Sequence, residues 1–404
     1  MKKLIRNVNV FDGKNSQLQI QRNIVIEENI VSAIETGDIS EDVFDEVIDG
    51  KGLTAMPGLI DAHVHLGTTF MPDGFLDYDI AVSAAIAKKM LMQGFTTVRD
   101  AGGIVQGLKK VFDQGILDGP RIFPCNSCIS QTCGHGDNYD HSIREIQYKI
   151  PTGSVLADGV PEVIRAVREQ FYKGASQIKI MAGGGCASKY DPLQTVQFSL
   201  EEMKAAVNTA SDYGTYVMAH LYTPECMKRA AKAGIKSFEH AHMMDEETAK
   251  MIQSEGIFVA PMPQFNKPRR PDQPVSKKGL MVREKEQNAT ELINKYDLKI
   301  LFGTDLMIMS PDQEPSDSID LTYYKKRFGS FKGLLAATGN VYDVFQLSTY
   351  QNPYPDGKLG VLEKGSYADI LLVQGNPVED LDILSEVDNI KLIMKDSKVY
   401  KNVI

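Results

Sequence analysis

Short apolar runs alternate with longer amphipathic stretches through most of the chain, from about residue 56 to residue 350. The runs have the length that is typical of buried strands, and the stretches between them are long enough for helices. This alternation predicts repeated β-α units around parallel strands. We expect eight strands, at 58–65, 96–100, 121–127, 177–181, 216–220, 236–240, 258–261 and 299–303.

Local signals mark the ends of several intervening helices. Ser199, followed by Glu202, forms a capping-box motif and predicts a helix that ends near Gly214. Further helices are expected at 161–174, 223–234 and 245–256, and each of these ends at a glycine. Two of them have a proline at or near the first helical position, which is a favourable place for that residue.

Both ends of the chain have a different pattern. Residues 4–11, 23–30, 369–373 and 390–399 are β-rich and are separated by turn residues. Because chain termini often lie close together, we expect the two ends to pair in one small β-sandwich.

The whole pattern predicts an α/β fold, the TIM (β/α)8 barrel, with this sandwich attached. A doubly wound open sheet is the alternative, but no GxGxxG motif follows the first strand. The expected domains are a barrel over residues 57–355 and a β-sandwich that combines residues 1–56 with residues 356–404.

Composition narrows the class of protein. The chain has 404 residues, of which 43% are hydrophobic and 24% charged, and its net charge is −9. This charge argues against a nucleic-acid partner and mildly favours cationic substrates. No run approaches the ~20 apolar residues of a membrane helix, and the first residues lack the apolar segment of a signal peptide. We therefore expect a cytoplasmic protein with no membrane partner, for which a homo-oligomer is compatible with the sequence.

The five cysteines do not indicate a disulfide framework, since their number is odd and the chain is long. Cys125 and Cys128 have the spacing of a zinc knuckle, but no second ligand pair completes that site. Reduced thiols are the preferred interpretation.

Polar residues gather at the predicted carboxyl ends of the strands, where TIM barrels place their chemistry. His63 and His65 alternate along the first strand and therefore point to the same face. One such histidine alone is most often an ordinary core or surface residue, but four of the seven histidines fall at strand ends. Neutral imidazole and carboxylate are ligands of zinc and similar ions, so the set predicts a metal site. Its members are His63, His65, Lys179, His220, His240 and Asp305.

The sequence resembles a known family. Met56-Pro57-Gly58-Leu59-Ile60-Asp61-Ala62-His63-Val64-His65 is similar to the opening strand of the amidohydrolase superfamily. Residues 360–370 resemble the return of that superfamily's chain into its small β-sandwich, so the resemblance covers nearly the whole chain. Residues 179–185, 219–224 and 238–240 resemble the branch of imidazolonepropionase-like dipeptidases, which includes prolidase-like and arginine-carboxypeptidase-like enzymes.

This resemblance implies two divalent metal ions, with zinc as the expected metal. Lys179 would react with CO₂ and bridge both ions as an N6-carboxylated lysine. An ammonium would be repelled by two cations, whereas a carbamate is anionic. The other implied ligands are His63, His65 and Asp305 for the more buried ion, and His220 and His240 for the more exposed ion.

The resemblance also implies hydrolysis of an amide bond. A hydroxide shared by the two ions would attack the carbonyl carbon, and Asp305 would accept its proton and deliver it to the leaving amine. Tyr222 would hydrogen-bond the carbonyl or the carboxylate of the substrate. His135, between glycines, is a second candidate for binding a substrate carboxylate. Gly184 either presents a backbone N–H to it or only turns the chain.

The expected substrate is a small peptide or an N-acyl amino acid with a free C-terminal carboxylate. Xaa-Arg/Lys peptides, cleaved by a dipeptidase or carboxypeptidase, are preferred because a cationic side chain needs an acidic partner and several acids follow strand ends. These acids are Asp137, Asp140, Asp191, Asp245, Glu314 and Asp317. The alternatives are an Xaa-Pro dipeptidase, whose pocket needs apolar walls, and an N-acyl amino acid hydrolase. Further alternatives are a cyclic-amide hydrolase or deaminase and a non-catalytic barrel scaffold, against which the complete ligand set argues.

Overall fold

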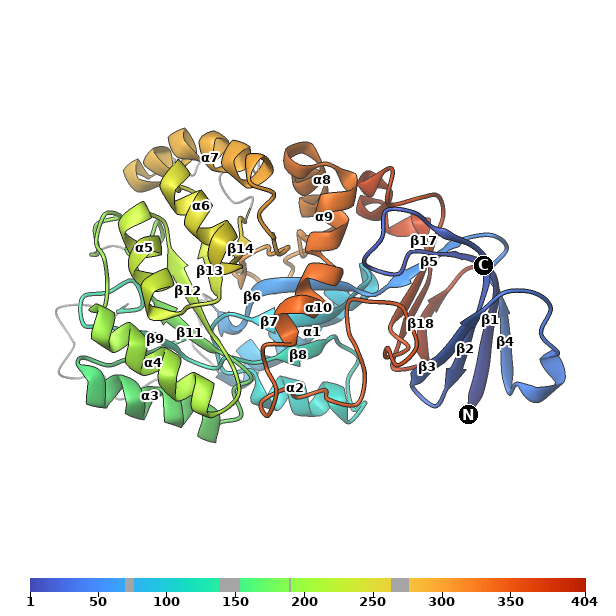
Figure 1. Ribbon diagram of the computed structural model, residues 1–404. Coiled ribbons are helices and arrows are strands. Elements are labelled where there is room, and N and C mark those ends of the chain that lie inside the picture. Colours follow the sequence, from blue (N-terminus) through green and yellow to red (C-terminus); the bar gives the residue numbers. More distant parts are fainter. Residues whose placement is uncertain (70–75, 138–152, 189, 263–275) are drawn as a thin grey trace.

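The computed structural model describes residues 1–69, 76–137, 153–188, 190–262 and 276–404. Parallel strands alternate with helices through the central part of the chain, as the hydrophobic pattern predicts (Figure 1). These strands are β6 (Leu59–Thr69), β7 (Phe95–Asp100), β8 (Arg121–Phe123), β9 (Cys128–Ser130), β10 (Ser154–Leu156), β11 (Ile178–Met181), β12 (Val217–Leu221), β13 (Ser237–His240), β14 (Phe258–Ala260) and β15 (Leu306–Ile308).

The parallel strands form two sheets. One has the order β10-β9-β11-β12-β13-β14, and the other has the order β15-β6-β7-β8. Residues 299–303, predicted as the eighth strand, have no regular strand pairing; instead β15 begins three residues later. Backbone hydrogen bonds nevertheless connect this segment to both sheets, from the Leu301 N–H to the Val259 carbonyl and from the Ala62 N–H to the Phe302 carbonyl, each 2.8 Å. The strand pairing itself does not close a barrel.

The predicted third strand is also interrupted. Only residues 121–123 of it form a strand, β8, which pairs with β7; the next strand, β9, begins at Cys128, after the predicted end, and pairs with β10 and β11. Asn126 lies between them with a φ angle of 59°, in the left-handed region that extended strands cannot include. This turn moves the chain from one sheet to the other.

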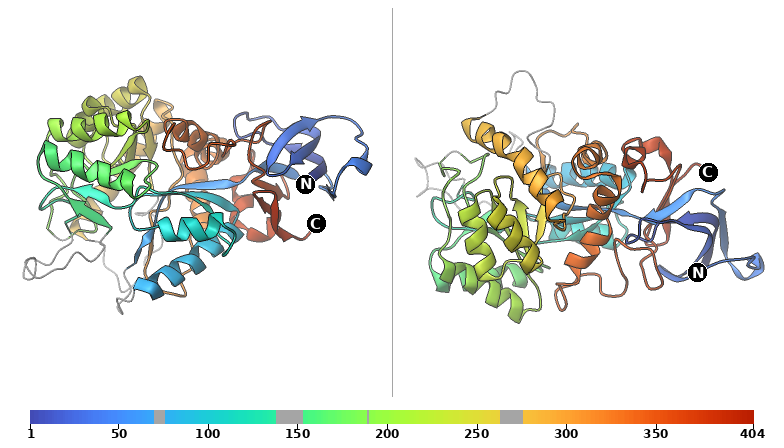
Figure 2. Two further views of the ribbon diagram at one scale, coloured as in Figure 1. Left: turned by 90° about the horizontal axis from the view of Figure 1, so that it is seen from below. Right: turned by 45° about the horizontal axis from the view of Figure 1, so that its top comes forward.

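Helices pack on the outside of these strands (Figure 2). The predicted capping box is present, because the Ser199 hydroxyl accepts from the Glu202 N–H and the Glu202 carboxylate accepts from the Ser199 N–H. Asp245 likewise caps its helix, whereas the Thr223 hydroxyl donates to Cys226 Sγ and caps no backbone N–H. The helices are α1 (Leu76–Met92), α2 (Gln106–Asp113), α3 (Val160–Tyr172), α4 (Leu200–Asp212), α5 (Pro224–Ala233), α6 (Glu246–Glu255), α7 (Lys277–Lys295), α8 (Asp317–Phe328), α9 (Ser330–Ala336) and α10 (Gly339–Phe345).

Strands from both ends of the chain join one sheet, beside the helices in Figure 1. Its order is β18-β17-β16-β5-β1-β2-β3, with β4 paired to β1, so it is one continuous eight-stranded sheet rather than two separate ones. The predicted segments 23–30 and 390–399 each cross a tight turn and divide into two strands. The strands are β1 (Lys2–Val10), β2 (Gln19–Glu27), β3 (Ile30–Glu35), β4 (Glu46–Asp49), β5 (Thr54–Pro57), β16 (Ile370–Val373), β17 (Ile390–Lys395) and β18 (Lys398–Asn402).

Hydrophobic side chains from both ends share one core inside this terminal sheet. Ile5 and Ile24 from the first part of the chain are fully buried with Ile370 and Leu392 from the last part. Because burial of each large aliphatic side chain contributes about 1.5–3 kcal/mol, the two ends stabilise each other.

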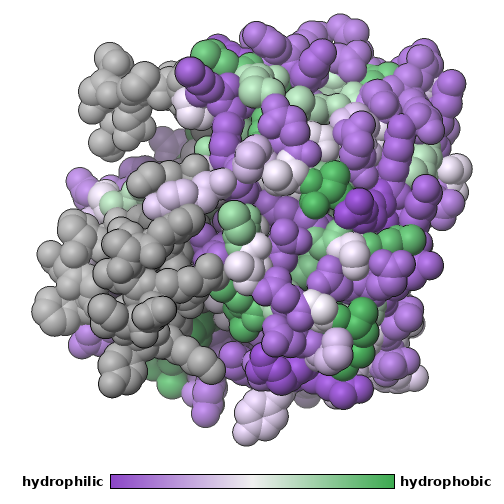
Figure 3. Space-filling model, turned by 90° about the vertical axis from the view of Figure 1, so that its left-hand side faces the viewer, coloured by the Kyte–Doolittle hydropathy of each residue, from purple (hydrophilic) through white to green (hydrophobic). Residues whose placement is uncertain are grey.

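The surface is mostly polar. Figure 3 shows hydrophilic side chains over most of the coloured part of one face, with hydrophobic residues in separate groups between them. Within the described ranges, none of the helices is long and apolar enough to cross a membrane.

Candidate metal centre

The six residues predicted from strand ends lie in one buried region. His63 and His65 come from β6, Lys179 from β11, His220 from β12 and His240 from β13. Each of these five residues is at most 8% exposed. The Asp305 side chain, which follows the interrupted eighth strand, is 7% exposed.

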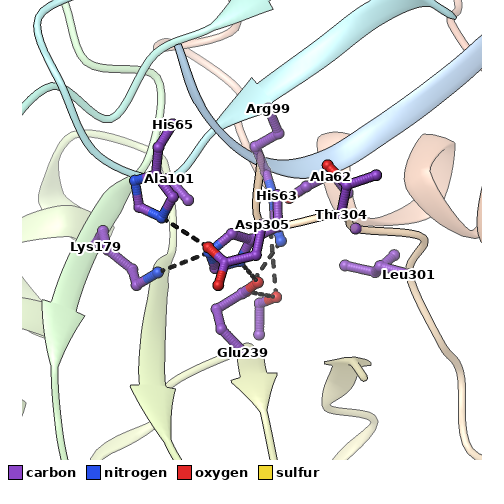
Figure 4. A network of polar contacts seen from close by, with 12 residues as sticks. Ala62, His63, His65, Arg99, Ala101, Lys179, Glu239, Leu301, Thr304 and Asp305 are labelled. Carbon is purple, nitrogen blue, oxygen red and sulfur yellow. Dashed lines mark hydrogen bonds and ion pairs between the residues drawn. The ribbon is translucent and has the colours of Figure 1, made fainter. Parts of the chain in front are cut away.

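His63, His65 and Asp305 form the tightest part of this region (Figure 4). Asp305 Oδ1 lies 3.4 Å from His63 Nε2 and 3.1 Å from His65 Nε2. Both Nδ1 atoms face groups that only accept hydrogen bonds, the Glu239 carboxylate at 2.5 Å and the Gly102 carbonyl at 3.1 Å. Each Nδ1 must therefore carry a proton, which leaves the Nε2 lone pairs directed toward Asp305.

His220 and His240 lie on the other side of His63. Their ring centroids are 4.5 Å apart, and the centroids of His240 and His63 are 5.5 Å apart. His220 Nε2 and His240 Nδ1 are buried, and neither has a hydrogen-bond partner among the described residues. Such atoms normally have partners in folded proteins, so this pair of nitrogen atoms is suited to ligation.

Lys179 is 1% exposed, and its Nζ lies 3.5 Å from His63 Nε2 (Figure 4). A buried ammonium among imidazoles is costly, because it loses its hydration and gains no opposite charge from neutral rings. Its contact with His63, and the pairing of its strand β11 with the His220 strand β12, are compatible with the bridging role that the sequence implies.

The backbone adopts unusual conformations at this site. His240, Ala241 and Asp305 have φ angles of 75°, 51° and 53°, a region that residues other than glycine rarely adopt. Successive side chains along a strand normally point to opposite faces of the sheet. The turn at His240 interrupts this alternation at the end of β13, so that Glu239 and His240 both contact His63. The Asp61 carboxylate accepts from the Thr304 N–H at 3.3 Å and from the Thr304 hydroxyl at 2.6 Å, and so holds the residue before Asp305 in place.

Burial has the largest effect on the protonation of these groups. It lowers the pKa of His220 and of His240 well below the ordinary value, and the neighbouring positive charges lower both further. Burial acts to raise the pKa of Asp305, whereas the hydrogen bonds and charges that protonated His63 and His65 rings would supply in the metal-free protein lower it well below its usual range. Neutral imidazoles beside an ionised carboxylate are the protonation states that a divalent ion requires.

These observations fit a metal site. His63 Nε2, His65 Nε2 and a carboxylate oxygen of Asp305 lie within 4.8 Å of one another, an arrangement that one cation can ligate. Nitrogen and carboxylate ligands are typical of zinc, and donors from four strands allow more than one ion.

Of the residues predicted to bind substrate, Tyr222 and His135 lie against predicted metal ligands, whereas the Gly184 N–H is already hydrogen-bonded within the protein. The Tyr222 ring stacks on His240 with centroids 4.9 Å apart, and the His135 ring stacks on His220 with centroids 4.0 Å apart. The His135 N–H donates to Gln197 Oε1, and its Nδ1 lies 2.8 Å from the Ser188 hydroxyl. The Gly184 N–H donates to the Thr195 carbonyl, so this N–H already has a partner within the protein.

Gly185 rather than Gly184 has a steric role beside the site. A Cβ atom at Gly185 would lie 2.0 Å from His135 Cε1, so only glycine allows the imidazole to approach this closely.

The acids that favoured a cationic substrate have other partners. Asp140 lies outside the described residues. The other five are engaged within the protein: Asp137 with the Cys133 N–H, Asp191 with Gly185 and Gln197, Asp245 with Thr248, Glu314 with Lys89, and Asp317, fully buried, with Asp61. The structure therefore supplies no support for a cationic side-chain pocket built from these five acids.

Two charged residues behind the site were not predicted. Glu239 and Arg99 are both fully buried and form an ion pair, with Arg99 Nη2 2.9 Å from Glu239 Oε1. Burial acts to raise the pKa of Glu239, but the charge of Arg99 and the hydrogen bond from His63 hold it below the ordinary value. Charged residues inside otherwise apolar strands were the available signal, because such residues are rarely buried without a partner.

The two cysteines of the CxxC motif, Cys125 and Cys128, are free and buried.

Comparisons with known proteins agree with this geometry. The model of the amidohydrolase family matches residues 54–400. Ochratoxinase from Aspergillus niger is 30% identical over 386 residues, covering 86% of this chain and 75% of the relative. A solved prolidase complexed with N-methylphosphonate-L-proline has a TM-score of 0.86 at 28% identity, and both chains are covered completely. A solved Xaa-Pro dipeptidase with bound methionine has a TM-score of 0.85 at 30% identity, again over all of both chains.

The family match covers far more than half of the chain and includes every residue of the metal site described above. The similarity to the solved structures extends over the terminal sheet as well as the parallel strands, because all of this chain is covered. The chain is therefore a member of the amidohydrolase family.

Proposed function

We propose that this protein is a metal-dependent hydrolase that cleaves an amide bond next to a free carboxylate. The observation that carries the proposal is the convergence of His63, His65 and Asp305 with His220, His240 and Lys179 in one buried region. The similarity to a prolidase, an Xaa-Pro dipeptidase and an ochratoxinase supports an amide as the substrate.

The proposed ligands are the six residues of that region, with two zinc ions as the expected metals and Lys179 carboxylated between them. When bound, such ions activate water and polarise a carbonyl group. The chain itself supplies the proton transfer: Asp305 accepts a proton and delivers it to the leaving amine.

We assign substrate binding to Tyr222 and His135. Tyr222 is held against His240, and burial raises the pKa of its hydroxyl well above the ordinary value, so it stays a hydrogen-bond donor. His135 is fixed by Ser188 and Gln197 beside His220, where an N–H donor suits the carboxylate of a substrate.

A neutral leaving amino acid is the preferred substrate, ahead of Arg or Lys. The five described acids that follow strand ends are already engaged, and the two solved relatives are an Xaa-Pro dipeptidase and a prolidase complexed with N-methylphosphonate-L-proline. An N-acyl amino acid with an apolar side chain meets the same requirements.

The test is to compare kcat/KM for Ala-Pro, Ala-Leu, Ala-Arg, Ala-Lys and N-acetyl-leucine, using zinc-loaded protein and a His63→Asn, His65→Asn double variant as control. We expect a neutral substrate to lead the cationic ones by at least about tenfold, or about 1.4 kcal/mol of transition-state discrimination. A tenfold lead of Ala-Arg or Ala-Lys would contradict the neutral preference. Equal rates with the double variant would contradict catalysis at this site.

Metal analysis separates the remaining alternatives. Two equivalents per chain are expected for the proposed site, whereas one equivalent favours a deaminase-like site and none favours a non-catalytic scaffold.

The proposal also includes the domain arrangement that the sequence predicts. An eight-stranded barrel over residues 57–355, with the ends of the chain as a separate domain, is supported by the hydrogen bonds of residues 299–302 to both parallel sheets.

A further inference from the structure

A buried polar network passes behind His63 and connects the two parallel sheets (Figure 4). Arg99, on β7, belongs to the same sheet as His63, whereas Glu239, on β13, belongs to the other sheet. The side chains of all three are fully buried. Neither Arg99 nor Glu239 has a role in the proposed reaction.

Glu239 contacts both of the other residues, each with a different oxygen atom. Oε2 lies 2.5 Å from His63 Nδ1, and Oε1 accepts from Arg99 Nη2 at 2.9 Å. The Ser237 hydroxyl also donates to Oε1, at 2.6 Å. Both oxygen atoms of the carboxylate therefore have donors, and this satisfaction fixes the orientation of the group.

Arg99 holds the backbone next to His63 as well as the carboxylate behind it. Its Nε donates to the Ala62 carbonyl at 2.6 Å, and its Nη1 donates to Tyr216 and Ser237 at 3.1 and 3.2 Å. A guanidinium offers its donors in a rigid plane, so it can define the position of several acceptors at once. The backbone and the ring of His63 are thus fixed by one network.

We propose that Glu239, supported by Arg99, is a positioning residue that sets the tautomer of His63 and directs its Nε2 lone pair into the metal site. This inference rests on the metal-binding part of the proposed function. A carboxylate can only accept, so Nδ1 must donate to it, and in the neutral imidazole that a metal ligand requires Nε2 is then unprotonated. An outer partner that fixes a ligating imidazole in this way typically changes metal affinity by 10–100-fold.

The substitution Glu239→Gln tests this chemistry at nearly constant shape. Glutamine has only one side-chain oxygen, but Arg99 and His63 both require an acceptor. If the oxygen faces Arg99, the amide NH₂ faces His63 Nδ1, which must then accept, so that the proton moves to Nε2. Ser237→Ala is the matched control, because it removes one donor to Glu239 and leaves the contact with His63.

The first measurement needs no substitution of Glu239 or Arg99. Nitrogen-15 NMR of metal-free, histidine-labelled wild-type protein distinguishes the two tautomers, and the His63 signals are assigned by their loss in His63→Asn. We expect His63 to carry its proton on Nδ1. A proton on Nε2 would overturn the proposal, whether or not Glu239→Gln folds.

The second measurement is zinc affinity, determined with the metal alone by chelator competition. We expect Glu239→Gln to bind zinc 10–100-fold more weakly, with His63 protonated on Nε2 in the metal-free protein, and Ser237→Ala to stay within about threefold of wild type. Wild-type affinity in Glu239→Gln would refute the positioning role. If wild type shows the expected tautomer and binds zinc but hydrolyses no amide, the proposed function fails while this inference stands.

Discussion

At the residue scale, the candidate centre concentrates groups that are individually costly to bury. Lys179 and Asp305 are charged in water, and removing such a group from water costs several kcal/mol after relaxation. Four imidazoles share the same region, and two of their nitrogen atoms are buried without a partner among the described residues. An arrangement of this kind weakens folding, so the expected compensation is a bound cation. Removal of the ligands should therefore affect metal content before it affects the fold.

Lys179→Ala should lose bound metal and nearly all activity. The variant lacks the amine that would carry the carbamate, so the two metal positions lose their shared anionic ligand. Short carboxylic acids such as propionate should restore part of the activity by occupying the vacated space. Metal content and kcat are the measurements, with Lys204→Ala, exposed on α4, as the control. Full activity in Lys179→Ala without added acid would contradict the bridging role.

Asp305→Asn should lower kcat by at least about 10²-fold, the usual scale for loss of general acid–base catalysis. Asparagine keeps the size of the side chain and one oxygen atom, but it does not exchange protons near neutral pH. Steady-state kinetics on the preferred substrate provide the measurement, together with metal content to show that ligands remain bound. A change confined to KM is the outcome that would exclude the proton-transfer role.

The six candidate ligands could be predicted because each lies in or just after a predicted strand, and parallel strands bring such positions together at one end of the sheet. Glu239 and Arg99 could not be paired in the same way. Their partners come from strands in different sheets, and a charged residue within an apolar strand shows only that some partner exists. The expected cationic pocket depended on acids that are engaged within the protein, and for Glu314 the partner, Lys89, is far away in the sequence and could not be inferred from it.

At the element scale, the sequence indicated helix ends better than strand ends. The capping box at Ser199 and the glycine after α5 are local features, whose geometry depends on neighbouring residues. The strand breaks near Asn126 and after residue 303 depend on pairing with distant strands, which periodicity within one segment does not reveal. The unpredicted role of Glu202 is of the same kind, because its carboxylate also accepts from the Gly159 N–H at the start of α3.

Glu202→Ala should destabilise both helix starts, by about 1–2 kcal/mol, the upper part of the range for lost caps. Its two oxygen atoms accept from the Ser199 and Gly159 N–H groups, each at 2.7 Å. Hydrogen exchange should therefore accelerate at both amides, and the denaturant midpoint should fall. Glu201→Ala is the control, since Glu201 has the same charge in the same helical turn. Faster exchange at Ser199 alone would show that the link to α3 is not stabilising.

At the scale of the whole molecule, buried charges connect the terminal sheet to the parallel strands. Arg121, on β8, is 4% exposed and pairs with Asp369 at 3.2 Å and with Asp396 at 2.7 Å. Asp396 belongs to the turn between β17 and β18. Lys395 donates from the same hairpin to the Gly119 carbonyl. The position of the terminal sheet is thus fixed by polar contacts at the edge of the strands that carry the candidate site.

Asp396→Asn should test this connection through its pH dependence. Burial acts to raise the pKa of Asp396, but Arg121 and Asn29 hold it below the ordinary value. A carboxyl whose pKa is lowered by folding contributes stability above its unfolded pKa of about 4, and this contribution is lost as the pH falls below that value. Wild type should therefore exceed Asp396→Asn by about 1 kcal/mol near pH 7, since solvent partly screens the pair, and by progressively less below pH 4.

Melting temperatures of both proteins between pH 7 and pH 3 provide the measurement for this last prediction. Asn tolerates the left-handed backbone of residue 396, where φ is 56°, so the substitution removes the charge without adding backbone strain. Asp388→Asn, exposed in the short 3-10 helix (Val387–Asn389) before β17, should show no pH-dependent difference from wild type. A difference for Asp396→Asn that stays constant with pH would mean that lost hydrogen bonds, rather than the charge of Arg121, connect the terminal sheet to the rest of the molecule.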